Sequence, residues 1–166
     1  MIPAAKPLIG DDERAAVDKV LRSGMLAQGP EVAAFEEEFS KFVGGRHCVA
    51  MNSGTSALHL GFIAGGIKPG DEVIVPSFSF AATANSVVLA GGVPVFADID
   101  PKTFNIDPNH VEKLITKKTK AIMPVHLYGH IAPMNEINAI AEKNNLIVFE
   151  DAAQGHLASL DGKNSG

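Results

Sequence analysis

The chain has 166 residues, of which 46% are hydrophobic and 20% charged, and this length suffices for one domain with a buried core. The formal net charge of -5, with no Lys/Arg cluster larger than that at 117–120, excludes nucleic acid as an expected partner, because a phosphate backbone is bound by clustered positive charge. The single cysteine, Cys48, excludes an internal disulfide framework and fits a reducing compartment.

The sequence also argues against a membrane partner. Residues 1–10 have neither the apolar core of a signal peptide nor the Arg-rich character of a presequence. Residues 73–97 carry no charge. However, Pro76, Gly91 and Pro94 interrupt this stretch, whereas a spanning helix needs a continuous apolar run. We interpret it as two buried strands flanking a buried helix, and we expect a cytoplasmic protein.

Two helices are predicted near the N-terminus. Residues 11–22 place their apolar side chains on one helical face, and Gly24 ends the pattern. Pro30 suits the first turn of a second helix. The second helix has a hydrophobic stripe, typical of core packing, that consists of Val32, Phe35, Phe39 and Phe42.

Strands and helices then alternate along the chain. The predicted strands are 48–51, 72–75, 93–97, 120–125 and 146–149. The predicted helices are 55–64, 81–89, 108–115 and 135–144. This alternation predicts an α/β fold, with a mostly parallel sheet and helices on both of its faces. Because such sheets bind ligands beyond the carboxyl ends of their strands, three places are candidate sites: 52–56, 76–80 and 150–154.

The first place is the small polar loop Asn52-Ser53-Gly54-Thr55-Ser56, which precedes a helix. Backbone N–H groups and hydroxyls at a helix N-terminus are typical of an anion site, and simple capping of the helix by Ser53 or Thr55 is an equal alternative. No G-x-G-x-x-G follows the first strand, and no G-x-x-x-x-G-K-[ST] is present. A bound phosphate would therefore belong to something other than a dinucleotide or ATP.

The other two places offer an aromatic ring and a carboxylate. In Pro76-Ser77-Phe78-Ser79-Phe80, an aromatic residue at a strand end provides a flat wall for a planar ring, and burial of both rings in the core is the alternative. Asp151 follows the apolar strand 146–149, and a carboxylate in such a partly dry position is costly unless it meets a cation or a donor. A pyridinium N–H is such a donor, and a helix cap is the alternative.

Six stretches, in order along the chain, resemble the DegT-type nucleotide-sugar aminotransferases, a family that depends on pyridoxal 5'-phosphate (PLP). They are NSGTSAL at 52–58, PGDEV at 69–73, PSFSF at 76–80, PVFADID at 94–100, PVHLYG at 124–129 and EDAAQ at 150–154. The resemblance implies the large domain of the aspartate-aminotransferase-like fold, without its C-terminal small domain. We expect an N-terminal helical segment at 1–45 and this incomplete cofactor-binding domain at 46–166.

The resemblance also implies roles for single residues around PLP. Gly54 and Thr55 would hold the cofactor phosphate, and Phe80 would stack on the pyridine ring. Asp151 would pair with the ring nitrogen. Gln154 would lie near the 3-hydroxyl group of the ring.

On the substrate side, Gly24, Met25 and Leu26 resemble a segment of the same family. The implied reaction, in a homodimer, moves an amino group from an amino-acid donor, glutamate, to a keto group of a nucleotide-linked sugar for polysaccharide or antibiotic synthesis. The family's Schiff-base lysine would lie in a later loop, so the sequence offers no catalytic residue. Lys163, in Asp161-Gly162-Lys163, fits a surface hairpin turn. Members of the family with histidine in place of the lysine are dehydratases, and a dehydratase remains the alternative.

Two other patterns suggest metal chemistry. Asp98-Ile99-Asp100 has the D-x-D spacing of metal-dependent glycosyltransferases, which are a less favoured alternative because Pro101 indicates a turn. His126, His130 and His156 lack the spacing of a metal site. We therefore expect no metal.

Overall fold

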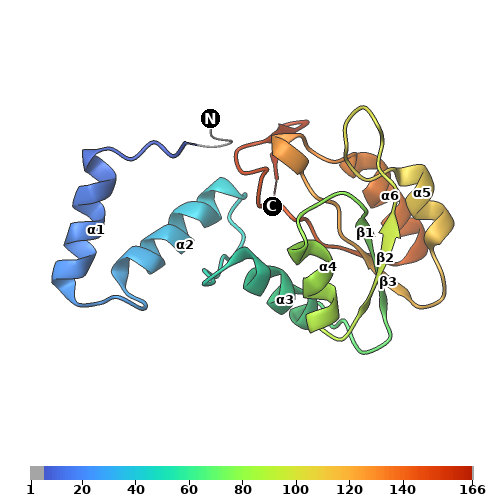
Figure 1. Cartoon of the computed structure of the whole chain (residues 1–166), viewed down its shortest axis with the longest axis horizontal. Coiled ribbons are helices and arrows are strands. Elements are labelled where there is room, and N and C mark those ends of the chain that lie inside the picture. Colours follow the sequence, from blue (N-terminus) through green and yellow to red (C-terminus); the bar gives the residue numbers. More distant parts are fainter. Residues whose placement is uncertain (1–5, 166) are drawn as a thin grey trace. The chain divides into compact units, whose positions relative to one another are not determined.

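The computed structural model describes residues 6–165 (Figure 1). The chain forms two compact units, of which one ends at Ala50 and the other begins at Met51. The division into domains between residues 45 and 46 stays a prediction. Within residues 6–165, no helix has the length and the apolar character needed to cross a bilayer.

The first unit contains the two predicted helices, α1 (Asp11–Ser23) and α2 (Pro30–Phe42). The first turn of α1 is acidic, which suits the positive end of the helix dipole, and Glu13 Oε2 accepts the N–H of Gly10 at 2.6 Å. Gly24 ends α1 in the left-handed conformation, at φ 72°, which favours glycine. The proline that opens α2 has the fixed φ that a first helical turn requires.

The hydrophobic stripe of α2 does not form a buried core. Neither helix of this unit buries a residue, and Phe35 is 54% exposed. The rings pack on one another along the helix instead, with centroids 5.7 Å apart for Phe35 and Phe39 and 5.9 Å apart for Phe39 and Phe42. The expectation of core packing is wrong here because two helices alone provide too few layers to enclose a side chain.

The strand predicted at 48–51 is not present in the described structure. A strand needs a paired neighbour, and residues 46–51 pair with no strand of the part of the chain that the structure describes. Val49 is 71% exposed, and the N–H of Ala50 donates to Glu36 Oε1 at 2.7 Å. The segment has the apolar residues that are typical of a strand, but this pattern does not show whether a partner strand lies beside it.

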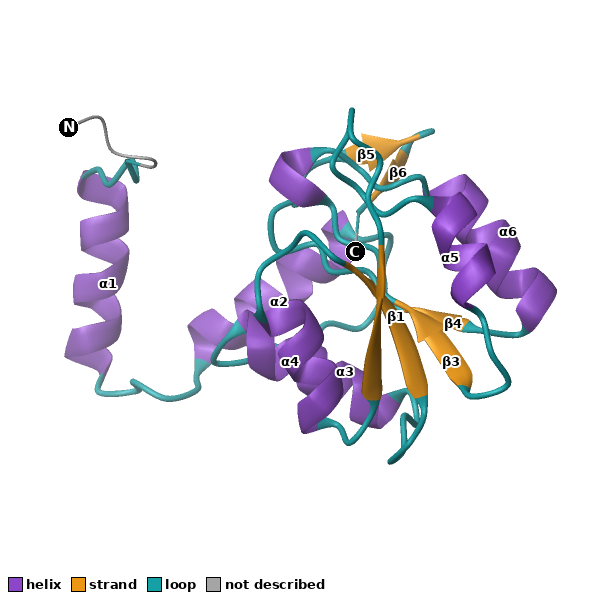
Figure 2. Ribbon diagram, turned by 45° about the vertical axis from the view of Figure 1, so that its right-hand side comes forward, coloured by secondary structure: helices purple, strands orange, loops and turns teal. Residues whose placement is uncertain are grey.

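The second unit is built on a four-stranded sheet (Figure 2). Its strands are β1 (Glu72–Pro76), β2 (Val93–Ala97), β3 (Thr119–Ile122) and β4 (Ile147–Val148). Their order is β2-β1-β3-β4, and all pairs are parallel, as predicted. β3 and β4 end earlier than predicted, but a single parallel bridge between Val125 and Asp151 continues their pairing beyond the regular ladder.

Helices cover both faces of the sheet, which confirms the predicted fold class (Figures 1 and 2). Side chains of α3 (Gly54–Ala64) and α4 (Ala82–Leu89) form the core on one face, and those of α5 (Pro108–Leu114) and α6 (Met134–Asn144) form it on the other. The first core contains Phe62, Val73, Val75, Val87 and Met123. The second core contains Ile74, Val111, Ile122, Ile137 and Ala141.

The alternation within β1 shows why this stretch is so apolar. Val73 and Val75 face the α3–α4 core, Ile74 faces the α5–α6 core, and all are fully buried. A parallel strand that is covered on both faces needs a continuous hydrophobic run. β1 is therefore the buried part of the uncharged stretch. The expected burial of the second strand and of the helix between them is only partly met, because Phe96 of β2 is 54% exposed and Leu89 of α4 is 59% exposed.

Two short elements complete the second unit. The 3-10 helix η1 (Leu127–Gly129) follows β3, and β5 (Ser159–Leu160) pairs with β6 (Lys163–Asn164) in an antiparallel hairpin. Asp161 and Gly162 form the turn with φ of 52° and 77°, which is the left-handed pair that a two-residue hairpin turn requires. The predicted hairpin around Lys163 is confirmed.

Candidate functional site

A cavity of about 700 Å³ lies at the carboxyl ends of the strands, where parallel sheets bind ligands. The N-terminus of α3, the loop after β1 and the residues that follow β4 line it. All five residues that the sequence predicts to bind the cofactor are among the lining residues: Gly54, Thr55, Phe80, Asp151 and Gln154. The structure thus brings these residues together, while their individual roles stay predictions.

At the N-terminus of α3, the predicted cap is present. Ser53 Oγ accepts the N–H of Ser56 at 3.1 Å. The first N–H that bonds within the helix is that of Ala57, which donates to Ser53 O at 3.0 Å, so the N–H groups of Gly54 and Thr55 have no partner within the helix. Capping and anion binding are therefore compatible here, because they use different N–H groups.

The two phenylalanines after β1 are not core residues. Phe80 is 72% exposed and lines the cavity, while Phe78 is 45% exposed and packs against Phe104 at a centroid distance of 5.9 Å. The core alternative is wrong for both rings because they lie beyond Pro76, the last buried residue of β1. An open aromatic face therefore borders the cavity.

Asp151 is only 7% exposed, and hydrogen bonds hold both its side chain and its backbone. Oδ1 accepts the N–H of Ala153 at 3.2 Å, and Oδ2 accepts the hydroxyl of Thr83 at 3.0 Å. The backbone of Asp151 pairs with the segment that follows β3. Its N–H donates to Pro124 O at 3.0 Å, and its carbonyl accepts the N–H of His126 at 3.1 Å. The carboxylate is therefore held in place at the edge of the cavity.

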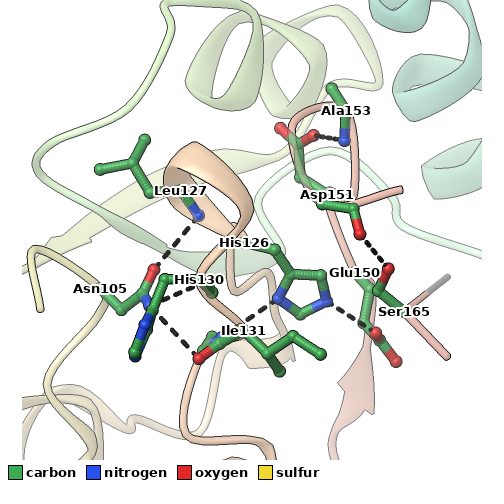
Figure 3. Close-up of polar contacts among 11 residues, drawn as sticks. Asn105, His126, Leu127, His130, Ile131, Glu150, Asp151, Ala153 and Ser165 are labelled. Atoms are coloured by element: carbon green, nitrogen blue, oxygen red, sulfur yellow. Dashed lines mark hydrogen bonds and ion pairs between the residues drawn. The ribbon is translucent and has the colours of Figure 1, made fainter. Parts of the chain in front are cut away.

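His126 is fully buried, and Figure 3 shows its ring beside the segment that carries Glu150 and Asp151. Its Nδ1 accepts the N–H of Ala132 at 3.2 Å, and its Nε2 lies 2.9 Å from Glu150 Oε2. Because Nδ1 is an acceptor, Nε2 carries the hydrogen and donates it to Glu150. Both ring nitrogens are thus used by the protein itself, which accounts for this histidine without a metal.

Asn105, which is 2% exposed, connects the loop after β2 to the loop after β3 (Figure 3). Its Oδ1 accepts the N–H of Leu127 at 3.3 Å. Its Nδ2 donates to the carbonyls of His130 at 3.1 Å and Ile131 at 3.4 Å. The side chain therefore fixes the loop that carries Tyr128.

Gln154 is held by that same loop. Its Oε1 accepts the N–H of Tyr128 at 2.8 Å, so the side-chain amide has a defined orientation and its Nε2 hydrogens remain for another acceptor. The next residue, Gly155, passes so close to His126 that an added Cβ would lie 2.6 Å from its Cβ. Only glycine fits this approach, and the loop from Asp151 to Gln154 is shaped by it.

The predicted substrate residues belong to the other unit. Gly24 ends α1, and Met25 and Leu26 lie in the loop before α2, where they are 53% and 65% exposed. Their role in substrate binding stays a prediction.

The D-x-D segment forms the predicted turn. Asp100 Oδ1 accepts the N–H of Lys102 at 2.7 Å and that of Thr103 at 2.9 Å. These backbone donors, Thr103 first and then Lys102, hold the pKa of the Asp100 carboxyl below its ordinary value. Across residues 6–165, no group of three or more His, Cys, Asp or Glu side chains is placed to hold a metal ion.

Sequence reasoning missed three residues that build the site: Thr83, Asn105 and His126. Thr83 lies in an uncharged helical stretch without a motif, and nothing in the sequence marks it. His126 follows a predicted strand at the sheet's carboxyl edge, and that position was a usable signal. Among the described residues, no buried side-chain nitrogen or oxygen lacks a hydrogen-bond partner, so this polar layer is fully satisfied.

Comparison with known proteins identifies the class of the chain. The family model of the DegT/DnrJ/EryC1/StrS aminotransferases matches residues 7–166. The chain therefore belongs to the DegT/DnrJ/EryC1/StrS aminotransferase family, as the six sequence stretches predict.

Three similar proteins illustrate this membership. The chain is 48% identical over 157 residues to UDP-2-acetamido-2-deoxy-3-oxo-D-glucuronate aminotransferase of Pseudomonas aeruginosa, covering 95% of this chain and 44% of that protein. It resembles the structure of NtdA from Bacillus subtilis with bound cofactor PMP, with a TM-score of 0.86 and 44% identity. The match covers 92% of this chain and 35% of that one. It also resembles GDP-4-keto-6-deoxymannose-3-dehydratase with a trapped PLP-glutamate geminal diamine, with a TM-score of 0.91 and 34% identity. That match covers 99% of this chain and 44% of the other. The chain spans less than half the length of the curated relatives that it matches.

Proposed function

We propose that this chain is the cofactor-binding part of a PLP-dependent sugar aminotransferase. The whole protein transfers an amino group, with glutamate as the amino-acid donor, to a keto group of a nucleotide-linked sugar used in polysaccharide or antibiotic synthesis. The observation that carries the proposal is the buried, hydrogen-bonded Asp151 in one cavity with an open aromatic face and a helix N-terminus. The Pseudomonas relative, whose name specifies a UDP-linked keto sugar, supports the substrate class.

The cofactor phosphate fits the N-terminus of α3. The N–H groups of Gly54 and Thr55 and the Thr55 hydroxyl provide donors, and the positive end of the helix dipole favours an anion there. An added Cβ at Gly54 would meet nothing within 4 Å, so open space adjoins these donors. Gly54 and Thr55 therefore bind and orient the phosphate.

The cofactor ring fits the remaining lining of the cavity. Phe80 presents its exposed face for stacking and keeps water from one side of the ring. Asp151 accepts the ring N–H and thereby holds the proton on that nitrogen, and Gln154 Nε2 donates to the 3-oxygen. When bound, the ring supplies an electron sink, and the chain's part is to bind the ring and to keep its nitrogen protonated.

The substrate side and the assembly complete the proposal. Gly24, Met25 and Leu26 contact the sugar substrate, and the exposure of Met25 and Leu26 supports that role. The protein is a cytoplasmic homodimer without nucleic-acid or membrane partners. Its net charge of -5 supports the absence of a nucleic-acid partner, and its single cysteine supports a reducing compartment.

A dehydratase of the same family is the second candidate. The resemblance to GDP-4-keto-6-deoxymannose-3-dehydratase, with a TM-score of 0.91, supports it. The two candidates share this cavity and differ in what happens to the amino group. The sugar product, aminated or dehydrated, therefore discriminates between them.

The decisive experiment is an absorption spectrum of the whole protein with PLP, before and after glutamate is added. We expect a cofactor band that glutamate converts to the pyridoxamine form, together with an aminated sugar product. Asp151→Ala should weaken PLP binding by about tenfold to a hundredfold, because a hydrogen bond to a charged group is lost. The exposed Asp12→Ala is the matched control and should leave binding unchanged.

The other outcomes are equally informative. Bound PLP with dehydration of the sugar and no amination would replace the aminotransferase by the dehydratase. The absence of any cofactor band in the folded whole protein would overturn the proposal.

A further inference from the structure

We propose that Thr83 is a positioning residue for Asp151, and that a chain of hydroxyls from Ser79 through Thr83 keeps this carboxylate aimed at the cofactor ring. The inference rests on the proposed function, because it concerns the same cavity. It adds a residue to which neither the sequence motifs nor the comparisons assign a role.

The geometry begins at the wall of the cavity. Ser79 lines the cavity, and its Oγ lies 2.8 Å from Thr83 Oγ1. Thr83, on the first turn of α4, is 1% exposed, and its Oγ1 lies 3.0 Å from Asp151 Oδ2. The two hydroxyls therefore link the cavity surface to a buried carboxylate.

The direction of donation along this chain follows from counting hydrogens. An ionised carboxylate has none, so Thr83 must donate its single hydroxyl hydrogen to Asp151. The Thr83 hydroxyl oxygen then accepts the hydroxyl hydrogen of Ser79. Each donation polarises the next hydroxyl, which strengthens the bond that reaches the carboxylate.

The arrangement fixes the orientation of Asp151. The N–H of Ala153 binds Oδ1 and the Thr83 hydroxyl binds Oδ2, so the carboxylate is held at both of its oxygens. A carboxylate has about four acceptor sites, so capacity remains for the ring N–H. A carboxylate aimed at the ring nitrogen favours a proton on that nitrogen, where it is needed to draw electrons from the substrate.

The test compares changes on the same helix in the whole protein. Thr83→Val removes only the hydroxyl and keeps the shape, whereas Thr83→Ser keeps the hydroxyl. Ser86→Ala is the matched control, because Ser86 is also buried in α4 and its hydroxyl bonds only the backbone carbonyl of Thr83, at 3.0 Å. Two readouts are measured: the equilibrium affinity for PLP, and the NMR signal of an isotope-labelled ring nitrogen in the bound cofactor.

We expect Thr83→Val to weaken PLP binding about tenfold and to move the ring-nitrogen signal toward that of unprotonated pyridine. Thr83→Ser should restore both values, and Ser86→Ala should leave the signal in place. Ser79→Ala, at the half-buried end of the chain, should shift the signal in the same direction by less. If Thr83→Val fails to fold, the signal of Ser79→Ala tests the positioning role instead.

Different results separate the inference from the proposed function. A wild-type protein that binds PLP, with a signal unmoved by Thr83→Val or Ser79→Ala, would overturn the positioning role and leave the proposed function intact. An equal shift in Ser86→Ala would also overturn it, because the effect would then be one of helix packing. A wild-type protein that does not bind PLP would remove both proposals.

Discussion

Single side chains at the strand ends owe their positions to hydrogen bonds between loops that are distant in sequence. Asn105 joins the loops after β2 and β3, and His126 joins the end of β3 to Glu150. Both are buried, so each polar group needs its partner, and a buried group left unpaired costs about 1–3 kcal/mol. The loop geometry is thus encoded in a few polar residues.

Removal of the Asn105 amide tests this dependence. Asn105→Leu leaves the Leu127 N–H and the His130 carbonyl without their partner, so we expect a loss of about 1–3 kcal/mol in the free energy of unfolding, measured by urea denaturation. Asn135→Leu, the same change at an exposed position of α6, should stay within about 0.5 kcal/mol of wild type. Equal stability of the two variants would contradict the proposed dependence.

Asp100 provides a pH-dependent test. Its folded-state pKa lies below the ordinary value of 3.8 because of the Thr103 and Lys102 N–H donors. The carboxylate therefore contributes stability that is present above the unfolded-state pKa and is lost as the pH falls through the folded-state pKa. Asp100→Asn should lower the Tm at neutral pH, and its Tm should approach that of wild type in acid. A Tm difference that is constant across the pH range would contradict this account.

At the scale of elements, α3 illustrates how helix and sheet are fitted together. Its C-cap, Gly65, packs against Phe149, and an added Cβ there would lie 2.4 Å from the ring. Phe149 in turn packs edge-on against Phe62 of α3, at a centroid distance of 4.7 Å. The end of α3 is thus positioned by the residue that leads from β4 into the candidate site.

Two glycine substitutions in α3 separate steric from conformational effects. Gly65→Ala should lower the free energy of unfolding by about 1–3 kcal/mol, because the new methyl group meets the Phe149 ring while the φ of -75° suits alanine. Gly61→Ala, where an added Cβ meets nothing within 4 Å, should raise it by up to about 1 kcal/mol, because alanine favours the helix. Urea denaturation measures both, and a stabilising Gly65→Ala would show that the packing is looser than described.

The helix and strand assignments were predictable wherever periodicity reports burial. The run in β1 is apolar because both of its faces are covered, and Pro30 and Gly24 mark helix ends by their backbone preferences. The strand predicted at 48–51 is absent, and its absence was not predictable, because pairing depends on a distant neighbour. In the site, Asp151 follows from the rule about strand ends, whereas the Thr83–Asp151 contact joins residues 68 positions apart and leaves no local pattern.

At the scale of the whole molecule, the two units differ in how their elements are stabilised. Neither helix of the first unit buries a residue, whereas β1 and β3 lie in cores on both faces of a sheet. Helices of 13 residues are marginal in water without packing. Local stability should therefore differ sharply along the chain.

Hydrogen exchange on the 166-residue chain checks this contrast. The amides of α1 and α2 should exchange much faster than those of β1 and β3, whose exchange requires opening of the sheet. Slow exchange in α1, comparable to that of β1, would contradict the expectation.

The backbone bridge of Asp151 also determines when the site forms during folding. Asp151 is fixed only after its segment has paired with Pro124 and His126 on the neighbouring strand end. Non-local pairing of this kind forms late in folding, because closing the loop costs conformational entropy before the stabilising contacts form. In refolding, competence to bind the cofactor should therefore lag behind helix formation, and PLP would report that the sheet is finished rather than act as a template for it.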